Sequence, residues 1–538
     1  MSSWRVKIAV KLIKLLSQSQ YKRFLAALQF PEQAQQRVFR DITENLSQSQ
    51  YGIALKIKKN ISYAIFKKFV PIISYDELIP WIEQAKHGKE NILTPHKINF
   101  FEKTSGSSAA AKYIPYNKLL LNSFNNMFRI WSYDLLSYGP KFKTGRFFMS
   151  ISPALSNEKF TVGNIPIGLE DDSHYLKNIW RELVKPFLVC PPHITDINNI
   201  NEFRYLLAAT LLAEEELEII SIWNPTYLLI IIDTINHNRE DLIRDLSKGY
   251  IKEKDYHYAF PALSIKRLEL LRKPSISWHE LWPNLIFISC WTSSTSVSSA
   301  KKIKELFPDI FIQGKGLLAT EAPMTLPLIG TLGYLPILNE VFFEFKDRAG
   351  DILLLHQLSI GESYELIISQ KSGFYRYCIG DVVRVVGIKN KTPSFEFIGR
   401  INNTCDMVDE KLTEVFVLGV LQCIIKCDDI FFMLVPLIDE NGFGSYLLLS
   451  EPGHTINSEI LDVGLSESHH YHNARLLGQL RQSKIMIAPN MGNLVQDFLI
   501  SQGMKWGNIK DKVFLTDILL AKQLIEYVTT RIVLMNMV

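Results

Sequence analysis

The pattern of apolar and polar positions changes twice along the chain. Residues 1–90 place apolar residues at helical spacing, as in "PEQAQQRVFRDITENL", and a further helix pattern at 117–139 ends at Gly139. Short apolar runs such as "RFFMSISP", "EIISIWNP", "NLIFISCW" and "DIFIQGKGLLAT" then alternate with helical patterns, which is typical of buried strands in a sheet covered on both faces. From residue 341 one strand pattern follows another, and this predicts an antiparallel or barrel-like section.

The chain divides near residue 400. The polar segment "INNTCDMVDEKLTE" follows the last of these strand patterns, and about 130 residues of mixed strand and helix patterns come after it. A chain of 538 residues also exceeds the usual size of one hydrophobic core. We therefore expect an α/β protein with a large N-terminal domain, 1–399, and a small C-terminal domain, 400–538.

Composition excludes several classes of protein. Hydrophobic residues make up 47% and charged residues 21% of the chain, as in ordinary globular proteins. The net charge of +4 gives no support for a nucleic-acid binder. Six cysteines without metal-site spacing indicate free thiols in a reducing cytoplasm. The most apolar internal run, "YLLIIIDTI" at 227–235, is too short to span a membrane, so we expect a cytoplasmic protein without a membrane span.

The first residues, "MSSWRVKIAVKLIKLLSQSQ", form an apolar helix pattern interrupted by Arg5, Lys7, Lys11 and Lys14. A secretory signal peptide would have an uninterrupted apolar region, so this segment is not read as one. Two interpretations stay open. The helix could contact a membrane surface, or it could pack across the surface of the large domain, and the second is favoured.

The segment "TSGSSAAAK" at 104–112 has the residues of an anion-binding loop. Small and hydroxylated residues offer backbone N–H groups and hydroxyls to a phosphate. The segment is not a Walker A motif, because Ala111 and not glycine stands immediately before Lys112, and Tyr113 stands where Ser or Thr is required. Taken alone, such a stretch is more often a plain surface loop.

The order of the other polar segments along the chain favours a phosphate-binding loop over a plain surface loop. The hydroxyl-rich loop is followed by "LLATE" at 317–321, "YCIGD" at 377–381, "GR" at 399–400 and "DEKLTE" at 409–414. Together with "FVPIISYDEL", "SIWNPTYLL", "LWPNLIFISCW", "FEFIGRINNTCDMVDEKLTE" and "GMKWGNIKDKV", this order resembles the Gretchen Hagen auxin-responsive acyl-acid amido synthetases in their bacterial form. That family lies within the adenylate-forming superfamily of acyl-CoA synthetases and luciferases.

The resemblance implies a fold and a set of site residues. The fold would be a large N-terminal adenylate-forming domain of mixed sheets flanked by helices, with a β-barrel-like section, and a small mobile C-terminal α+β domain. Thr320 would donate to the α-phosphate of ATP, Glu321 would ligate Mg²⁺ and Asp381 would accept from the ribose. Lys411 would swing toward the phosphates, and Thr320, Glu321 and Lys411 would be the catalytic residues. The implied ATP-binding residues are Thr104, Ser105, Gly106, Ser107, Ser108, Lys112, Thr320, Asp381, Arg400 and Lys411.

Each of these residues also has a simpler interpretation. A Thr-Glu pair commonly begins a helix, an Asp after a glycine commonly caps a turn, and a lone lysine is commonly a solvated surface charge. Tyr375 and Tyr377 would either stack on the adenine or pack in a core. His469, His470 and His472 read as an exposed loop rather than a metal site.

The function expected from the resemblance is ATP-dependent adenylation of a small carboxylic acid, followed by acyl transfer to an amine, with an amino acid as the favoured amine. An acyl-CoA or acyl-carrier ligase with the same first step, and a non-catalytic nucleotide-binding protein, are the alternatives. The acyl pocket would be built from 117–139, the "WNPTYLL" region and the segment after Glu321, and an aromatic or medium-chain acid is expected there.

Overall fold

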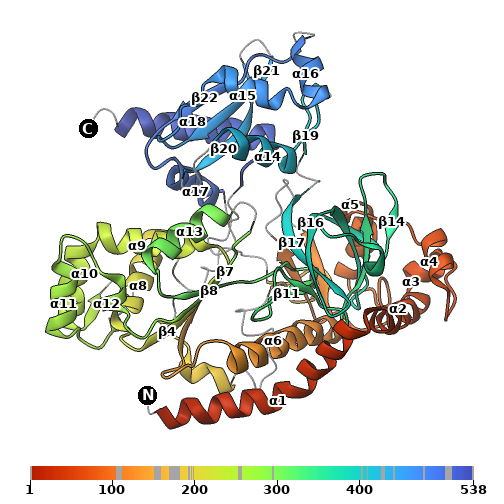
Figure 1. Ribbon diagram of the computed structural model, residues 1–538, viewed down its shortest axis with the longest axis horizontal. Helices are drawn as coiled ribbons and strands as arrows, with labels where there is room; N and C mark the ends of the chain where they lie inside the picture. Colours follow the sequence, from red (N-terminus) through yellow and green to blue (C-terminus); the bar gives the residue numbers. More distant parts are fainter. Residues whose placement is uncertain are drawn as a thin grey trace.

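The computed structural model describes most of the chain, and three sheets with their helices dominate its architecture (Figure 1). The described residues are 3–104, 112–150, 159–168, 182–191, 194, 197, 199–252, 257–293, 296–400, 404–408, 410–425, 430–439, 443–476, 479–502 and 512–535. The mixed α/β organisation and the covered strands expected from the apolar pattern are confirmed.

The first sheet is parallel. Its strands lie in chain order, β3 (Arg146–Met149), β4 (Leu217–Ser221), β7 (Phe287–Cys290) and β8 (Phe311–Gly314). The helices around it are α8 (Ile200–Ala213), α9 (Pro225–His237), α10 (Arg239–Lys248), α11 (Ile265–Arg272), α12 (Trp278–Leu281) and α13 (Val297–Leu306), and the short pair β5 (Tyr250–Lys252) and β6 (His257–Ala259) lies between α10 and α11. Apolar residues from strands and helices join one buried core, as a sheet covered on both faces requires.

The second sheet is antiparallel and has the order β14-β13-β15-β16-β17. Its strands are β13 (Phe342–Lys346), β14 (Ile352–Leu353), β15 (Ser363–Ser369), β16 (Tyr377–Lys389) and β17 (Thr392–Arg400). The sheet is open, with β14 and β17 at its edges, so the barrel-like section is a curved antiparallel sheet and not a closed barrel. Its core includes residues of α2 (Pro31–Gln48), α3 (Gln50–Ala54), α4 (Tyr63–Phe69) and α5 (Tyr75–Lys86).

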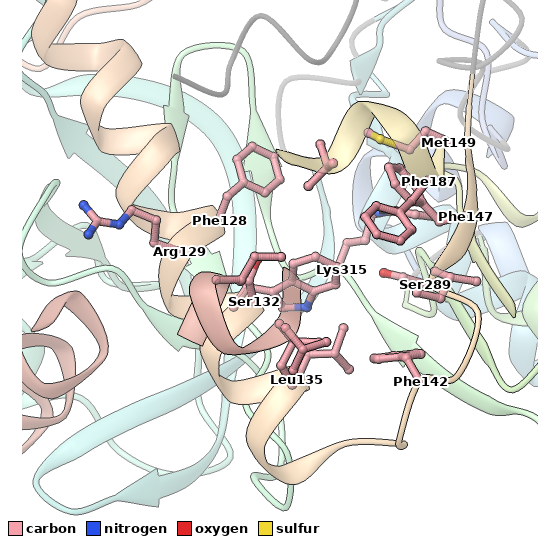
Figure 2. A pocket seen from close by; sticks show the side chains of 18 of the residues that line it. Phe128, Arg129, Ser132, Leu135, Phe142, Phe147, Met149, Phe187, Ser289 and Lys315 are labelled. Atoms are coloured by element: carbon pink, nitrogen blue, oxygen red, sulfur yellow. Dashed lines mark hydrogen bonds between the residues drawn. The ribbon is translucent and has the colours of Figure 1, made fainter. Parts of the chain in front are cut away.

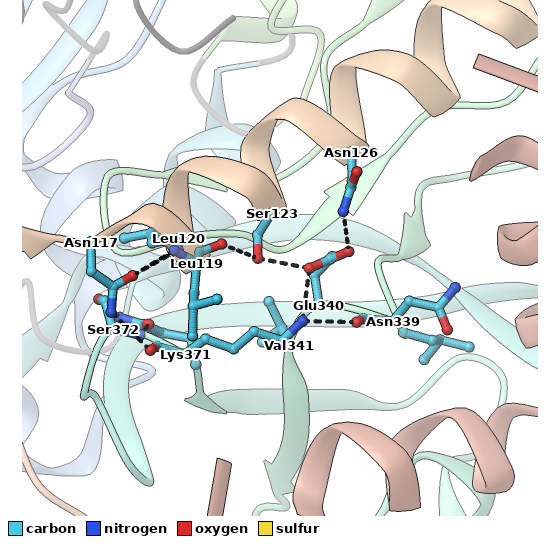
Figure 3. A network of polar contacts seen from close by, with 12 residues as sticks. Asn117, Leu119, Leu120, Ser123, Asn126, Asn339, Glu340, Val341, Lys371 and Ser372 are labelled. Atoms are coloured by element: carbon cyan, nitrogen blue, oxygen red, sulfur yellow. Dashed lines mark hydrogen bonds and ion pairs between the residues drawn. The ribbon is translucent and has the colours of Figure 1, made fainter. Parts of the chain in front are cut away.

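Two long helices cross between these sheets. The helix α6 (Lys118–Tyr138) begins after Asn117, whose side chain accepts from the N–H groups of Leu119 and Leu120 and donates to the carbonyl oxygen of Lys371. Figure 3 shows how Glu340 holds the same helix, since its carboxylate accepts from Ser123 at 2.8 Å, from Asn126 and from Lys371. These bonds fix α6 on the antiparallel sheet.

The N-terminal helix α1 (Ser3–Gln29) packs along α6 (Figure 1). The Tyr21 hydroxyl donates to Asp134 of α6 at 3.0 Å, and the Arg129 guanidinium donates to the carbonyl oxygen of Leu16. The favoured interpretation of this segment, a helix packed across the domain, is therefore confirmed. No helix of the described residues combines the length and the apolar character needed to cross a bilayer.

The third sheet belongs to the C-terminal residues. The strand β20 (Phe432–Ile438) pairs antiparallel with β21 (Gly444–Ser450), which pairs parallel with β22 (Lys484–Ile487). The remaining elements are β18 (Thr404–Cys405), β19 (Leu412–Thr413), α14 (Glu414–Ile424), α15 (Ser458–Leu465), α16 (His469–Leu476), α17 (Met491–Ser501) and α18 (Ile518–Met535). One face packs with α14, α15 and α16, and the other packs with α17 and α18.

The histidine cluster lies in α16, so the expectation of a loop at His469, His470 and His472 is wrong. A Ser468 carbonyl accepts from the His472 N–H and contributes to this helical turn. Within the described part of the chain, no group of three or more His, Cys, Asp or Glu residues could hold a metal ion.

Candidate active site

The ends of the predicted phosphate loop are adjacent. The strand β1 (Phe100–Thr104) pairs antiparallel with β2 (Lys112–Tyr116), and Thr104 stands opposite Lys112. The Lys112 ammonium lies 5.3 Å from the centre of the Tyr75 ring. Ser105, Gly106, Ser107 and Ser108 lie outside the described residues, so their role as a phosphate loop stays a prediction.

Thr320 and Glu321 form a tight turn. They join β9 (Leu318–Ala319) to β10 (Ala322–Pro323), which pair antiparallel with Ala319 opposite Ala322. The pair therefore does not begin a helix, and the simpler interpretation of this Thr-Glu is wrong. The Tyr116 hydroxyl, at the end of β2, donates to the Thr320 carbonyl oxygen at 2.6 Å and ties the turn to the loop-bearing hairpin.

The Glu321 carboxylate is buried beside Tyr377, whose hydroxyl donates to it at 3.3 Å. Burial raises the pKa of Tyr377, and the negative charge of Glu321 raises it further. Tyr377 therefore remains a neutral hydrogen-bond donor that orients the carboxylate. Tyr377 and Tyr375 are both core residues, and the Tyr375 hydroxyl donates to the Leu93 carbonyl oxygen, so packing explains these tyrosines.

Asp381 and Arg400 form an ion pair across two strands. The strands β16 and β17 place Asp381 directly opposite Arg400, and the Arg400 Nε donates to Asp381 Oδ1 at 2.6 Å. Asp381 is fully buried within a strand, so its interpretation as a turn cap is wrong. The negative charge of Asp381 raises the pKa of Arg400, and Glu321 contributes in the same direction. Glu321, Tyr377, Asp381 and Arg400 thus form one cluster of interacting side chains.

One oxygen of this ion pair has no partner. Asp381 Oδ2 is buried and makes no hydrogen bond with the residues that the structure describes. Buried carboxylate oxygens are normally satisfied, because leaving one without a donor costs about 1–3 kcal/mol. An incoming hydroxyl group would supply the missing donor.

Lys411 lies across the junction, on the C-terminal side. It is exposed and adopts a positive φ of 44°, which is uncommon for a residue other than glycine. Its neighbour Glu410 is fully buried and accepts from the N–H groups of Met407 and Val408 and from the Tyr446 hydroxyl. Glu410 therefore fixes the Lys411 segment to the C-terminal sheet, a role that the sequence motif did not reveal.

Lys512 is a further cation near this junction that the sequence did not single out. Burial lowers its pKa, and the nearby charges of Glu414 and Arg400 also act on it. Its position links the segment before α18 to the last residue of β17. The only sequence signal was the lysine-rich "GMKWGNIKDKV", which does not say which lysine approaches Arg400.

A largely apolar cavity of about 250 Å³ lies between α6 and the parallel sheet (Figure 2). Phe128 and Leu135 of α6, Phe147 and Met149 of β3, and Phe187 contribute to its lining. The expected pocket segments are present, because α6 residues, Trp223 and the Leu326-Pro327 segment all border it. Leu318 connects the cavity to the turn at Thr320 and Glu321, since it precedes Thr320 by two residues and also lines the cavity.

The cavity lies at the carboxyl edge of the parallel sheet, where open α/β sheets commonly bind ligands. Ser150, Ser221 and Lys315 border it at the ends of β3, β4 and β8. The Lys315 ammonium donates to the Ser221 hydroxyl at 2.8 Å and lies over the Trp223 ring. Four residues of α1 also line the cavity, and the apolar pattern of that helix had not assigned it to a pocket.

The chain is similar in sequence to known amido synthetases and shares the fold of one of them. The Arabidopsis thaliana indole-3-acetic acid-amido synthetase GH3.4 is 22% identical over 423 residues, which cover 71% of this chain and 69% of that protein. The Nicotiana attenuata jasmonoyl-L-amino acid synthetase JAR6 is 23% identical over 65% of this chain and 66% of its own. A solved structure of the acyl acid amido synthetase AtGH3.15 in complex with 2,4-DB shares the fold, with a TM-score of 0.79, 18% identity and 96% of each chain covered.

Family models match two consecutive parts of the chain. Residues 334–400 match the GH3 family central domain, which contains the strands of Asp381 and Arg400. Residues 20–312, more than half of the chain, match the GH3 family N-terminal domain. The protein therefore belongs to the GH3 family.

Proposed function

We propose that this protein is an AMP-forming ligase, which activates a small carboxylic acid with ATP and then joins the acyl group to an amine. The observation that carries the proposal is the cluster of Glu321, Asp381 and Arg400, together with an apolar cavity whose lining includes Leu318, the residue that leads into the Glu321 turn. The names of the relatives, indole-3-acetic acid-amido synthetase and jasmonoyl-L-amino acid synthetase, support an amino acid as the amine.

The ribose of ATP is assigned to Asp381. Its unpartnered Oδ2 is an acceptor in a buried position, and a ribose hydroxyl is a donor of the required kind. Arg400 holds the other oxygen and presents a positive charge toward the same region. The phosphates are assigned to Thr104, Ser105, Gly106, Ser107, Ser108, Lys112 and Thr320, because β1 and β2 hold the two ends of the predicted loop together and the Tyr116 bond ties this hairpin to the Thr320 turn.

Glu321 fits a ligand for Mg²⁺. Magnesium bound to ATP is typically held by one or two protein carboxylates, with phosphates and water filling its other positions. When bound, the ion would offset the charge that develops on the α-phosphate and on the leaving pyrophosphate. Tyr377 holds the Glu321 carboxylate in place through its hydroxyl, so the ligand is oriented before the nucleotide arrives.

The acid is assigned to the apolar cavity. Its volume of about 250 Å³ lies just below the usual range of small-molecule sites, about 300 to 1,000 Å³, so the acid is expected to be small. Aromatic and aliphatic side chains such as Phe128, Phe142 and Leu135 would surround the apolar part of an aromatic or medium-chain acid. Its carboxylate would then point past Leu318 toward Thr320, where it can attack the α-phosphate.

We further propose that residues 400–538 move against residues 1–399 between the two half-reactions. Glu410 ties Lys411 to the C-terminal sheet, so a rotation of that unit would carry the Lys411 ammonium toward the phosphates. Closure would also exclude water, which would otherwise hydrolyse the acyl-adenylate. Because the reaction consumes ATP, a cytoplasmic location is part of this proposal.

The test is acid-dependent exchange of pyrophosphate into ATP, measured with Mg²⁺, without amine and across a panel of aromatic and aliphatic acids. We expect exchange with a subset of apolar acids, and AMP release should then rise when the correct amino acid is added. AMP release that depends on coenzyme A or a carrier thiol, and not on an amino acid, would instead indicate an acyl-CoA or acyl-carrier ligase. ATP binding without exchange for any acid would contradict the ligase proposal.

Lys411→Ala is expected to slow adenylation by about 10- to 100-fold, because it removes a cation from the charge that builds on the phosphates. Lys56→Ala is the matched control, since Lys56 is also an exposed lysine with a positive φ, 58°. Both variants should fold alike, and only Lys411→Ala should lose pyrophosphate exchange. A Lys411→Ala variant that exchanges normally and fails only in amide formation would contradict the assigned role.

A further inference from the structure

The helix α1 carries two apolar faces with different surroundings. Its inner face borders the cavity with Val6, Ala9, Val10 and Ile13, which follow one another at helical spacing. The bonds of Tyr21 to Asp134 and of Arg129 to the Leu16 carbonyl anchor the helix to α6 on this side. The helix lies at the edge of the molecule (Figure 1), so it separates the cavity from the outside.

The outer face is apolar and exposed. Trp4, Ile8, Leu12, Leu15 and Leu16 have exposed fractions of 59%, 48%, 41%, 68% and 39%. Spacings of four, four, three and one residue place these five side chains on one side of the helix. Other exposed apolar side chains of the described residues are scattered one or two to an element, whereas here five gather within 13 residues. Exposed apolar groups of this kind mark a contact surface.

The positive charge around this face favours a negatively charged partner. Lys7 and Lys11 are exposed and four residues apart, so they lie beside the apolar side chains, whereas Lys14 is half-buried over the Tyr133 ring of α6. The first 31 residues contain six Lys or Arg and no acidic residue, a larger positive charge than the +4 of the whole chain. A second copy of α1 would bring like charges together, whereas the phosphates of an anionic bilayer are complementary.

We propose that α1 lies in the headgroup layer of an anionic lipid bilayer, with Trp4, Ile8, Leu12, Leu15 and Leu16 inserted and with Lys7 and Lys11 on the lipid phosphates. The stretch from Trp4 to Leu16 is about 18 Å long at 1.5 Å per residue, which suits a helix lying along a membrane surface. The inner face then places the cavity directly behind the membrane contact. If the proposed function holds, an apolar acid dissolved in the bilayer is the substrate that this arrangement favours.

The experiment is co-sedimentation of the full-length protein with vesicles, without ATP, acid or amine. Vesicles of phosphatidylcholine mixed with phosphatidylglycerol are compared with vesicles of phosphatidylcholine alone, at low and high salt. We expect the protein to pellet with the anionic vesicles, at least tenfold more than with the neutral ones, and to be released by salt. The result does not depend on catalysis, so it separates this proposal from the ligase assignment.

Variants of α1 test whether this helix is the part of the protein that binds the vesicles. Leu15→Ser and Lys7→Gln/Lys11→Gln should each weaken vesicle binding by about tenfold or more. Leu519→Ser is the matched control, because Leu519 is also a helical leucine with an exposed fraction of 68%, and it should bind like the wild type. Circular dichroism should show all of these variants folded, since the changed side chains face solvent.

Three outcomes would overturn the proposal. The first is no binding to anionic vesicles at low salt. The second is binding that Lys7→Gln/Lys11→Gln abolishes while Leu15→Ser leaves it unchanged, since the apolar face would then not be inserted. The third is a dimer in solution that Leu15→Ser dissociates, since the outer face would then cover a second copy of the chain.

Discussion

Glu321→Gln is expected to lower acid-dependent pyrophosphate exchange by about 1,000-fold. The variant keeps the size of the side chain and an oxygen that can accept from Tyr377, so the turn between β9 and β10 should remain intact. It loses the negative charge that a magnesium ion requires from its protein ligand. Metal-assisted stabilisation of phosphate charge is worth several kcal/mol, and each 1.36 kcal/mol corresponds to about tenfold in rate.

The control for this variant is Glu365→Gln. Glu365 is also a buried glutamate, and it lies on β15, the strand next to that of Asp381, where it contacts Lys346 and accepts from the Cys378 thiol. We expect Glu365→Gln to retain exchange within a few fold of the wild type. Exchange should be measured over a range of Mg²⁺ concentrations, with ATP binding followed in parallel. Equal exchange in Glu321→Gln and the wild type would remove Glu321 from the metal site.

The sequence predicted the layout of the fold because that layout follows from local patterns. Apolar runs of strand length between helical patterns correspond to β3, β4, β7 and β8, and the strands after residue 341 correspond to the antiparallel sheet. The segment 117–139 became α6, with its cap at Asn117 and its end at Gly139. These signals depend on neighbours in the chain, so one sequence is enough to read them.

The contacts within the site depend on strand register, which local patterns do not set. The pairing of β16 and β17 shifts by one residue between Val385 and Gly387 and shifts back between Val382 and Val383, so Asp381 stands opposite Arg400 only because the two irregularities offset each other. A shift of one residue would send these side chains to opposite faces of the sheet. The sequence named both residues through their motifs, but not the ion pair or the unpartnered oxygen of Asp381.

The sequence did not predict that α1 lines the cavity, and the reason is different. An apolar helix with interleaved lysines predicts a surface helix, and nothing in its spacing says that one face borders a cavity. The anchoring contacts come from Arg129 and Asp134, more than a hundred residues away along the chain. Tertiary contacts of this kind decide what a helix covers, and they leave no signal in the helix itself.

Arg376→Met is expected to destabilise the protein by about 3–5 kcal/mol, the usual result of breaking a buried ion pair. The Arg376 Nε donates to both carboxylate oxygens of Glu344, at 3.1 and 2.9 Å, and the guanidinium also donates to the carbonyl oxygens of Lys67 and Val70. Both side chains of the pair are almost fully buried, with exposed fractions of 4% and 1%. Methionine fills most of the volume but leaves the Glu344 carboxylate without its cation.

The matched control is Arg384→Met, on the same strand β16. Arg384 pairs with Glu396 at 2.8 Å, but its side chain is 48% exposed, so we expect a change below about 1 kcal/mol. A double variant, Arg376→Met with Glu344→Leu, should recover part of the loss, because no uncompensated charge stays buried. Denaturant titration followed by circular dichroism measures all three.

The Arg376→Met change should also lower activity at the candidate active site. Arg376 lies one residue before Tyr377, and its carbonyl oxygen accepts from the Ile73 N–H, which docks the segment before α5 against this strand. Since Tyr377 orients Glu321, pyrophosphate exchange in Arg376→Met should fall at temperatures where the variant is still folded. A destabilisation no larger than that of Arg384→Met would mean that hydrogen bonds elsewhere hold this segment and that the buried pair does not support the metal ligand.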